Sequence, residues 1–287
     1  DIKPLDGVLS VKYGEGMVEQ LVSVFDVIKN VSIMKETKLF ENVYQTVFQG
    51  ELIINERESF VVYIAVPEKW YRDLVDIYVP DYNELAYMPH IDNKGKLCLF
   101  ETEGILIDQN LPGIMMQSLL RAQTILKQGF SGENKNDFIN EFELYWAQLK
   151  DCRIAHLAVE TDRKNRIVKG GIKKSSKRKK EKQIEYIKRC KKAPIYIGEN
   201  VESLKRWNLE KTPVMNIAYF VIYSEKYIFP PDIRKKLSID YLNALLHFVP
   251  EGELASIMPR SRQDRIVVFE IHQPSGQTHF VGMYIKG

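Results

Sequence analysis

Apolar residues follow two different periods along the chain, and they predict one helix followed by a group of strands. Between Met17 and Ile28 the apolar positions recur every three or four residues, which is typical of one face of a helix. From Val31 to Val79 the stretches VYQTVFQGELII and SFVVYIAVP are instead rich in β-branched and aromatic residues. LVDIYVP adds a strand that ends at Pro80. We therefore expect one helix and then an antiparallel four-strand meander.

Chain breakers and then helical spacing follow the meander. The stretch 81–97 contains Gly95 and other turn-forming residues and reads as irregular. Pro112 lies where the first turn of a helix is expected, and apolar residues keep helical spacing from there to Gly129. After a polar loop, aromatic residues fall on one face of a further helix, 138–149. We interpret that aromatic face as core packing.

A strongly basic stretch divides the sequence. Residues 163–192 hold fifteen Lys and Arg and two Glu, a net charge of +13 (15 − 2), whereas the whole chain carries +3. Like charges repel and the stretch has little apolar mass, so we predict a basic linker over 156–192. Three strand-like stretches (MNIAYFVIY, RIVVFEIH and HFVGMYI) and a helix capped by Ser238 follow. They predict a second domain of mixed α and β structure, 193–287.

Composition excludes several classes of protein. The chain has 287 residues, of which 45% are hydrophobic, and this is enough for two domains. No apolar run is long enough to span a membrane. Residues 1–16 are polar and contain no apolar core, so we expect no signal peptide. Three widely spaced cysteines are a poor disulfide framework, so we expect a cytoplasmic protein. Neither C-x-x-C nor H-x-x-x-H spacing occurs, so we expect no metal site.

One cysteine, Cys98, follows a stretch with the residues of a shaped loop. In MPHIDNKGKLCL, Asp92 can accept hydrogen bonds in an Asx turn, and Gly95 can take a positive φ. A thiol placed after such a loop can be held at the surface for nucleophilic attack. The alternative is that Cys98 is a small apolar residue of the strand-like KLCLF, a common setting for free cysteine. Cys152 and Cys190 lack a comparable loop.

The same segment resembles the active-site segment of ubiquitin-conjugating enzymes. Members of that family carry His-Pro-Asn, a turn, and then Gly-x-Ile-Cys-Leu, with the cysteine eight residues after the Asn. In this chain Met88, Pro89 and His90 stand at the triplet, and His90 lies eight residues before Cys98. Gly95 opens the second half, GKLCL. Since the order of elements also agrees, the resemblance extends beyond the motif to roughly residues 10–150.

The resemblance implies a fold and a reaction. The fold is α+β: a UBC-like catalytic domain, 1–155, with an N-terminal helix, a four-strand meander, an active-site loop and C-terminal helices. Cys98 would accept an activated protein C-terminus as a thioester and pass it to an amine, with a lysine side chain as the expected acceptor. His90 would help to stabilise the oxyanion, because an imidazole can donate a hydrogen bond. No cofactor is implied, because ATP belongs to the activating partner.

The departures from the triplet, Met88 for His and His90 for Asn, are most similar to bacterial members. In particular they resemble the conjugating half of the activating–conjugating fusion proteins of CBASS anti-phage operons. Those proteins attach the C-terminus of a cGAS-like nucleotidyltransferase to a target. The implied partners are an adenylating domain in cis or in trans, a ubiquitin-like or cGAS-like donor, and a protein amine. Residues 193–287 would then be an accessory region preceding an adenylation domain that this sequence does not contain.

Two other functions stay open. A UBC-like domain can serve as a non-catalytic binding module, although such variants typically lose the cysteine that is kept here. The basic run 163–192 could instead bind nucleic acid, since its cations could neutralise phosphates. Only Tyr186 interrupts the run with an aromatic ring, so the run itself lacks a stacking platform. We therefore favour a solvated linker over nucleic-acid contact for this stretch.

Overall fold

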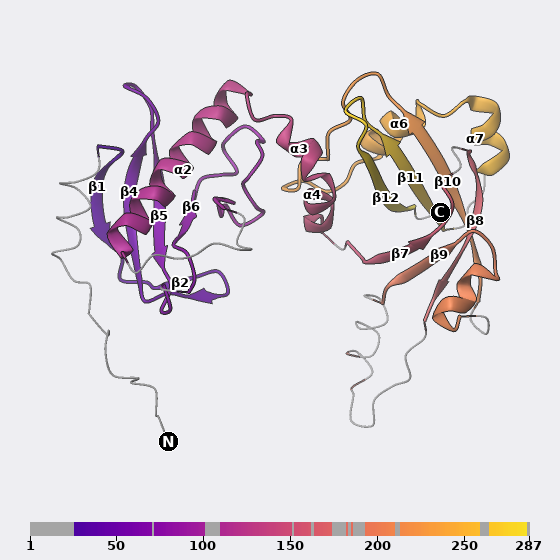
Figure 1. Cartoon of the computed structure of the whole chain (residues 1–287), viewed down its shortest axis with the longest axis horizontal. Helices are drawn as coiled ribbons and strands as arrows, with labels where there is room; N and C mark the ends of the chain where they lie inside the picture. The colour runs from indigo at the N-terminus through magenta and orange to yellow at the C-terminus, as the bar shows by residue number, and fades with distance from the viewer. Residues whose placement is uncertain are drawn as a thin grey trace. The chain divides into compact units, whose positions relative to one another are not determined.

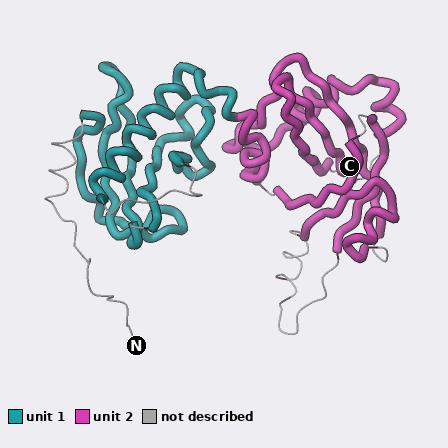
Figure 2. Tube along the Cα trace, in the orientation of Figure 1, with its two compact units in different colours: residues 1–137 teal, residues 138–287 magenta. Residues whose placement is uncertain are grey.

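The protein folds into two compact units, residues 1–137 and 138–287 (Figure 2). Each unit has its own β-sheet with helices packed on it (Figure 1), so the mixed α and β class predicted from the sequence is confirmed. The structure is a computed structural model. It describes residues 26–70, 72–100, 110–150, 152–161, 164–173, 182, 185, 193–209, 213–258 and 264–285.

The first unit is built on a four-stranded antiparallel sheet in the order β1-β4-β5-β6. β4 and β5 pair along their whole length, and they occupy the two stretches richest in β-branched and aromatic residues. A short hairpin, β2–β3, precedes β4. The bounds of these strands are β1 Ile28–Ile33, β2 Lys38–Leu39, β3 Asn42–Val43, β4 Thr46–Ile53, β5 Ser59–Val66 and β6 Asp76–Tyr78.

Strand β1 corrects the end of the helix predicted for 17–28. Ile28 is the first residue of β1, is buried, and pairs with Leu52 of β4. Its side chain lies over Gly50, where an added Cβ would meet it at 2.7 Å. One apolar residue at helical spacing fits the start of a strand equally well, so periodicity alone could not separate the two. The remainder of the predicted helix, 17–25, lies outside the described residues.

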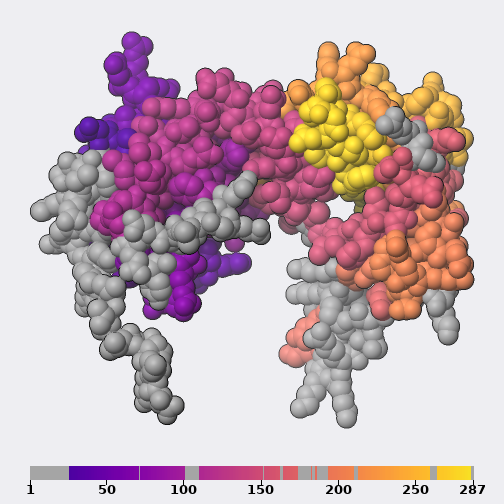
Figure 3. Space-filling view, viewed as in Figure 1, coloured from indigo at the N-terminus to yellow at the C-terminus, as the bar shows by residue number. Residues whose placement is uncertain are grey.

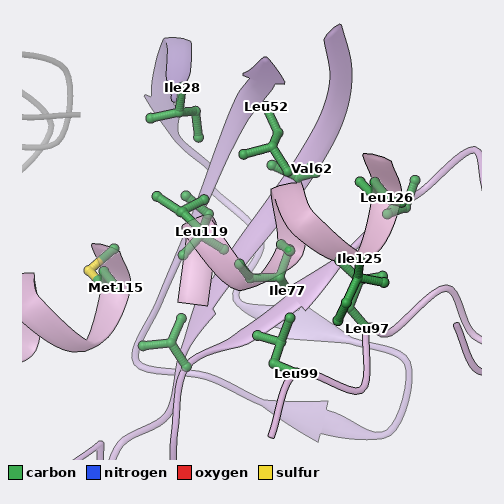
Figure 4. Packing of buried hydrophobic residues seen from close by; sticks show 14 of the residues in the cluster. Ile28, Leu52, Val62, Ile77, Leu97, Leu99, Met115, Leu119, Ile125 and Leu126 are labelled. Atoms are coloured by element: carbon green, nitrogen blue, oxygen red, sulfur yellow. The ribbon is translucent and has the colours of Figure 1, made fainter. Parts of the chain in front are cut away.

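Helix α2 (Leu111–Ser131) crosses one face of this sheet (Figure 1) and completes the core. Asn110 caps its first turn, in which Pro112 also lies, and Gly132 ends it in a left-handed conformation. The buried side chains of α2 and of the strands form one cluster, part of which is shown in Figure 4. This cluster is the support against which the segment around Cys98 packs.

The second unit is built on a six-stranded mixed sheet in the order β12-β11-β10-β8-β9-β7. The β10–β11 and β7–β9 pairs are parallel, and the other three neighbouring pairs are antiparallel. The three stretches predicted as strands form β10, β11 and β12. The bounds are β7 Ala155–Ala158, β8 Arg166–Ile172, β9 Ile195–Gly198, the 3₁₀-helix η1 Ser203–Trp207, β10 Met215–Tyr223, β11 Arg265–His272 and β12 Thr278–Ile285.

Strands β7 and β8 differ from the linker predicted over 156–192. Val168 of β8 is buried in the core of the second unit, while Arg166 and Lys169 of the same strand keep polar partners. Strand alternation lets a basic sequence bury every second side chain, so net charge alone could not exclude a strand. Most of the remaining basic residues lie outside the described part of the chain.

The aromatic helix predicted over 138–149 is divided into α3 (Asp137–Asn140) and α4 (Phe142–Gln148). Its aromatic face is buried, as expected, but it packs within the second unit. The Phe142 ring stacks on His279 of β12 at 4.8 Å between ring centroids. The boundary between the compact units therefore lies after Asp137, the first residue of α3, whereas the sequence suggested a boundary near residue 155.

The second unit has two further helices, α6 (Ile239–Leu246), which buries Leu242 and Leu245, and α7 (Glu251–Ile257), which buries no residue. Ser238 caps α6, as the sequence predicted, by accepting a hydrogen bond from the Tyr241 amide. Over the described residues, the helices are all too short or too polar to cross a bilayer.

Candidate active site

Cys98 lies on a short extended segment that presents its thiol away from the core. Leu97 and Leu99 on either side are buried and belong to the cluster beneath α2, as Figure 4 shows, whereas Cys98 is exposed. Successive side chains of an extended chain point to opposite sides, so burying both leucines turns the cysteine outward. The structure therefore favours the presented thiol over the cysteine packed in a strand.

The loop before Cys98 is fixed by hydrogen bonds. The Asp92 carboxylate accepts from the amides of Lys94 (2.8 Å) and Lys96 (2.9 Å), which is the Asx turn predicted from the sequence. Gly95 has φ +80°, and an added Cβ there would meet the Val79 carbonyl oxygen at 2.5 Å. The loop thus needs glycine at this position, because the backbone has a positive φ and there is no room for a side chain.

The amides of residues 94–98 are all used within the structure. The Cys98 amide donates to the His90 carbonyl at 2.8 Å, and the Leu97 amide donates to Ile77 at 2.8 Å. The Gly95 amide donates to the Asp92 carbonyl, and the two adjacent amides donate to the Asp92 side chain. The amides of residues 94–98 therefore hold the loop, and an oxyanion would need a donor from elsewhere.

His90 is joined to Cys98 through its backbone and to Asp137 through its side chain. Its φ of +64° is uncommon for a residue other than glycine, although histidine is among the residues enriched there. Imidazole Nε2 lies 2.8 Å from Asp137 Oδ2. An ionised carboxylate only accepts hydrogen bonds, so Nε2 carries the proton in this contact. This contact joins two residues that are 47 positions apart in the sequence, and it restricts the orientation of the His90 ring.

Asp137 contacts His90, although no pattern in the sequence indicated it. It lies at the end of the polar loop after α2, a stretch of acidic and amide residues with no distinguishing spacing. Only the fold brings it to His90. The signal that could have found it is chemical: a partly buried imidazole requires a hydrogen-bonding partner.

Met88, the first departure from the family triplet, is explained by packing. Its side chain is buried, and an added Cβ on Gly129 of α2 would meet its sulfur at 2.5 Å. A polar imidazole at this position would lose its hydrogen bonds to water in an apolar site, at a cost of about 1–3 kcal/mol. The position is therefore a contact between the loop and α2.

A polar cluster anchors the residue two positions before the thiol. Lys96 Nζ lies 2.7 Å from Asp76 Oδ1, and the Tyr44 hydroxyl donates to the other oxygen of Asp76 at 2.8 Å. Burial by itself would lower the pKa of Lys96, but the Asp76 carboxylate outweighs it and raises that pKa. Burial and the hydrogen bonds to Tyr78 and Asp76 raise the pKa of Tyr44. Lys96 is therefore held as a cation.

The other two cysteines and two histidines of the second unit have different surroundings. Cys152 is exposed after α4, and burial of part of its side chain raises the pKa of its thiol. Cys190 lies outside the described residues. His272 and His279 lie on the β11–β12 hairpin, where each contacts a glutamate. In the part of the chain that the structure describes, His, Cys, Asp and Glu side chains form no group of three that could hold a metal ion.

Comparison with known proteins gives one result that covers this site. Residues 29–154 match the family described as prokaryotic E2 family B, a range that begins in β1 and ends just before β7. No curated protein and no solved structure gives a match. The matched range contains Cys98, His90 and Asp137. Residues 29–154 are thus similar to prokaryotic E2 family B, and the match supports an E2-like domain of the ubiquitin-conjugation type in this part of the chain.

Proposed function

We propose that the protein is a conjugating enzyme that carries an activated protein C-terminus as a thioester on Cys98. The observation that supports this most directly is the exposed Cys98 thiol between two buried leucines, with its backbone tied to His90. It lies within the range similar to prokaryotic E2 family B. The exposed thiol and its rigid support are what acyl transfer to a cysteine requires.

The proposed reaction has two transfers. The Cys98 thiolate attacks the activated carbonyl carbon of the donor, a carbon–sulfur bond forms, and the activating group leaves. An amine, in our proposal a lysine side chain, then attacks the thioester carbonyl. The carbon–nitrogen bond forms, the amine loses a proton, and the thiolate leaves. Each attack places negative charge on the carbonyl oxygen, which needs a hydrogen-bond donor.

His90 is the donor that we propose for this oxyanion. The amides of residues 94–98 already donate to partners in the loop, so they do not fill the role. Since Nε2 of His90 faces Asp137, the proposed donor is Nδ1–H of the doubly protonated ring. This differs from an Asn amide, which donates at every pH.

The partners that we propose come from the resemblance. The activating partner is an adenylating domain, in cis in a longer protein or in trans. The donor is a ubiquitin-like protein or a cGAS-like nucleotidyltransferase, and the acceptor is a protein amine. The setting would then be conjugation in CBASS anti-phage defence, in the cytoplasm.

The test compares two exposed cysteines. The full chain is incubated with an adenylating enzyme, its donor protein and ATP, and it is then run on a non-reducing gel. We expect an adduct that thiols remove, that is lost in Cys98→Ala and that is kept in Cys152→Ala, its matched control. Cys98→Ser should give an oxyester that resists thiols. An adduct that persists in Cys98→Ala would exclude the proposal.

The same assay separates a catalyst from a binding module. A scaffold with this fold would bind the donor without forming a covalent adduct. His90→Ala should still form the adduct, because the thiol is intact, but should discharge it more slowly to added amine. Discharge at the wild-type rate would remove His90 from the mechanism and would leave the role of Cys98 unchanged.

A further inference from the structure

A hydroxyl, an imidazole and a carboxylate form one hydrogen-bonded row on the sheet of the second unit. Thr278 Oγ1 of β12 lies 3.0 Å from Nδ1 of His272, its partner on β11. Nε2 of the same ring lies 2.8 Å from Oε1 of Glu270. The other oxygen of Glu270 accepts a hydrogen bond from the Tyr219 hydroxyl at 2.6 Å. Part of the surface of β12 is seen in yellow in Figure 3.

The order of these contacts determines which ring nitrogen can act as a base. Burial and the hydrogen bond to Glu270 raise the pKa of the Tyr219 hydroxyl, so the tyrosine keeps its proton. A carboxylate only accepts hydrogen bonds, so Nε2 of neutral His272 carries the proton and Nδ1 keeps a lone pair. That lone pair faces the Thr278 hydroxyl. A hydroxyl, a base and a carboxylate that orients the base are the three parts of a nucleophilic triad.

The His272 ring is held in its plane and reaches the surface. Tyr223 of β10 is the partner of His272 on the neighbouring strand, and the two rings stack with centroids 4.5 Å apart and planes 6° from parallel. The His272 side chain is 20% exposed, whereas that of Glu270 is completely buried. The imidazole therefore joins a buried carboxylate to a hydroxyl that solvent can reach, because Thr278 is only partly buried.

The backbone amide of Thr278 faces the outer edge of the sheet. The Gln273 amide donates to the Gln277 carbonyl at 2.8 Å, so these two residues form a hydrogen-bonded pair. Pairs alternate in an antiparallel ladder, so the amides of His272 and Thr278 point away from each other. Among the described strands β12 is at the edge, so the Thr278 amide points to the side where none of them pairs. The amide of a nucleophile is a typical oxyanion donor.

Two exposed aromatic rings lie beside the hydroxyl. Phe280 is two residues after Thr278 on the edge strand, so both side chains lie on the same face of the sheet. Tyr223 lies on the other side of His272. Both rings are exposed, and apolar parts of a small substrate can pack against them.

We propose that Thr278, His272 and Glu270 form a second nucleophilic site, which hydrolyses small activated carboxylic esters. Thr278 Oγ1 attacks the ester carbonyl, an oxygen–carbon bond forms, and the hydroxyl proton passes to His272 Nδ1. The alcohol leaves with that proton. Water then attacks the acyl–threonine and gives a proton to Nδ1, which returns it to Thr278 as the acid leaves. The proposal goes beyond acyl transfer at Cys98 and does not depend on it.

A network that only satisfies the buried carboxylate explains fewer of these observations. Both oxygens of Glu270 already have a hydrogen bond, from Tyr219 and from His272, without Thr278. Such a network gives the Thr278 hydroxyl no special reactivity. The two accounts therefore differ in one measurable property, the rate at which this hydroxyl is acylated.

The test measures acylation of the full chain by p-nitrophenyl acetate. The reaction is stopped with acid at short times, and the acetylated residues are mapped by mass spectrometry. We expect an acetyl group on Thr278 and none on Thr124, an exposed threonine of α2 whose hydroxyl donates to the Leu120 carbonyl at 2.9 Å. Both threonines belong to the same folded molecule, so this comparison does not depend on a variant that folds. Acetyl groups on Cys98 are counted separately, so this proposal and the thioester proposal can fail independently.

The variants test each role in the row. His272→Gln keeps a polar side chain but has no base, and it should slow acetylation of Thr278 about 100-fold. Thr278→Ser keeps the hydroxyl and should still be acetylated at residue 278, whereas Thr278→Ala should lose this part of the p-nitrophenol release. Thr124→Ala is the matched control and should release p-nitrophenol like the wild type.

Three results would overturn the proposal. The first is a wild-type chain without an acetyl group on Thr278, and the second is equal acetylation of Thr278 and Thr124. The third is acetylation of Thr278 at the wild-type rate in His272→Gln, which would show that the imidazole does not act as the base. Any of these would leave the row as a structural network of the sheet.

Discussion

The His90 imidazole and the Asp137 carboxylate form a pair with 2.8 Å between Nε2 and Oδ2. His90 stands eight residues before Cys98 in an uncommon backbone conformation, with its carbonyl held by the Cys98 amide. Asp137 lies at the start of α3, the last residue of the first unit. The contact ties the ring of the candidate donor to the end of the unit and determines which nitrogen carries the hydrogen bond. Asp137 is therefore a positioning residue for His90.

Replacing Asp137 should alter the orientation of the His90 imidazole without disrupting the fold. Asp137→Ala removes the acceptor, and we expect discharge of the Cys98 thioester to slow about tenfold or more, since small errors in positioning are costly. Asp137→Asn keeps a carbonyl acceptor but loses the charge, and it should fall between the wild type and Asp137→Ala. The imidazole ¹⁵N spectrum of His90 should report an altered tautomer or protonation state in both variants.

The control for this prediction is Glu133→Gln, which neutralises an exposed carboxylate in the same loop without contacting His90. It should leave both the discharge rate and the spectrum unchanged. An unaltered His90 spectrum in Asp137→Ala would show that the pair does not hold the ring, whatever happens to the rate.

Substituting two glycines of the first unit distinguishes the effect of backbone strain from the effect of steric crowding. Gly95 and Gly132 have almost the same φ, +80° and +77°, but an added Cβ meets the Val79 carbonyl only at Gly95. Gly132→Ala should lower the free energy of unfolding by about 1–2 kcal/mol from strain alone. Gly95→Ala should cost more, and it should also slow adduct formation at Cys98. Equal losses in denaturant unfolding would mean that the loop shifts freely, which would contradict its role as a rigid support.

The Lys96–Asp76 pair predicts a pH dependence of stability. The carboxylate raises the pKa of Lys96 in the folded state, even though burial alone would lower it. A raised folded-state pKa stabilises the protein below the unfolded value of about 10.4, and this stabilisation is lost as pH rises through the folded value. Asp76→Asn should therefore be less stable than the wild type at neutral pH, with the difference shrinking above about pH 10.

The size of that difference should be small. Lys96 is 37% exposed, so solvent screens the pair, and we expect no more than about 1 kcal/mol. Glu41→Gln is the control, because Glu41 is 88% exposed and 3.6 Å from Lys94. It should show no pH-dependent difference in urea unfolding. A gap for Asp76→Asn that widens toward alkaline pH would have the wrong sign for this account.

Much of the fold was predictable because local chemistry and packing agree. The paired strands β4 and β5 carry β-branched and aromatic residues. Pro112 lies in the first turn of α2, and Ser238 caps α6, as the sequence predicted. The secondary structure was assigned wrongly where tertiary contacts determine it. Ile28 is a strand residue because it pairs with Leu52 and its side chain packs over Gly50. The basic stretch of β8 is a strand because it pairs with β9 and β10. Neither cause is local in sequence.

In the candidate site too, local features were predictable from the sequence and features that depend on tertiary contacts were not. The Asx turn at Asp92 and the positive φ of Gly95 are local devices, so the sequence predicted them. The orientation of Cys98 depends on the burial of Leu97 and Leu99, and KLCLF by itself left open whether Cys98 is presented or packed. Asp137 was not predictable, because a pair 47 residues apart leaves no spacing to recognise.

The central claim is that the donor is carried on the sulfur of Cys98, and locating the acylated atom tests it most directly. The adduct formed with the adenylating enzyme is digested in acid without reductant, and fragment mass spectrometry maps it. We predict the C-terminal residue of the donor on Cys98 Sγ, joined by a bond that hydroxylamine cleaves. Acylation of Cys152, of a lysine, or of no residue in a reaction where the adenylating enzyme itself is charged would contradict the account.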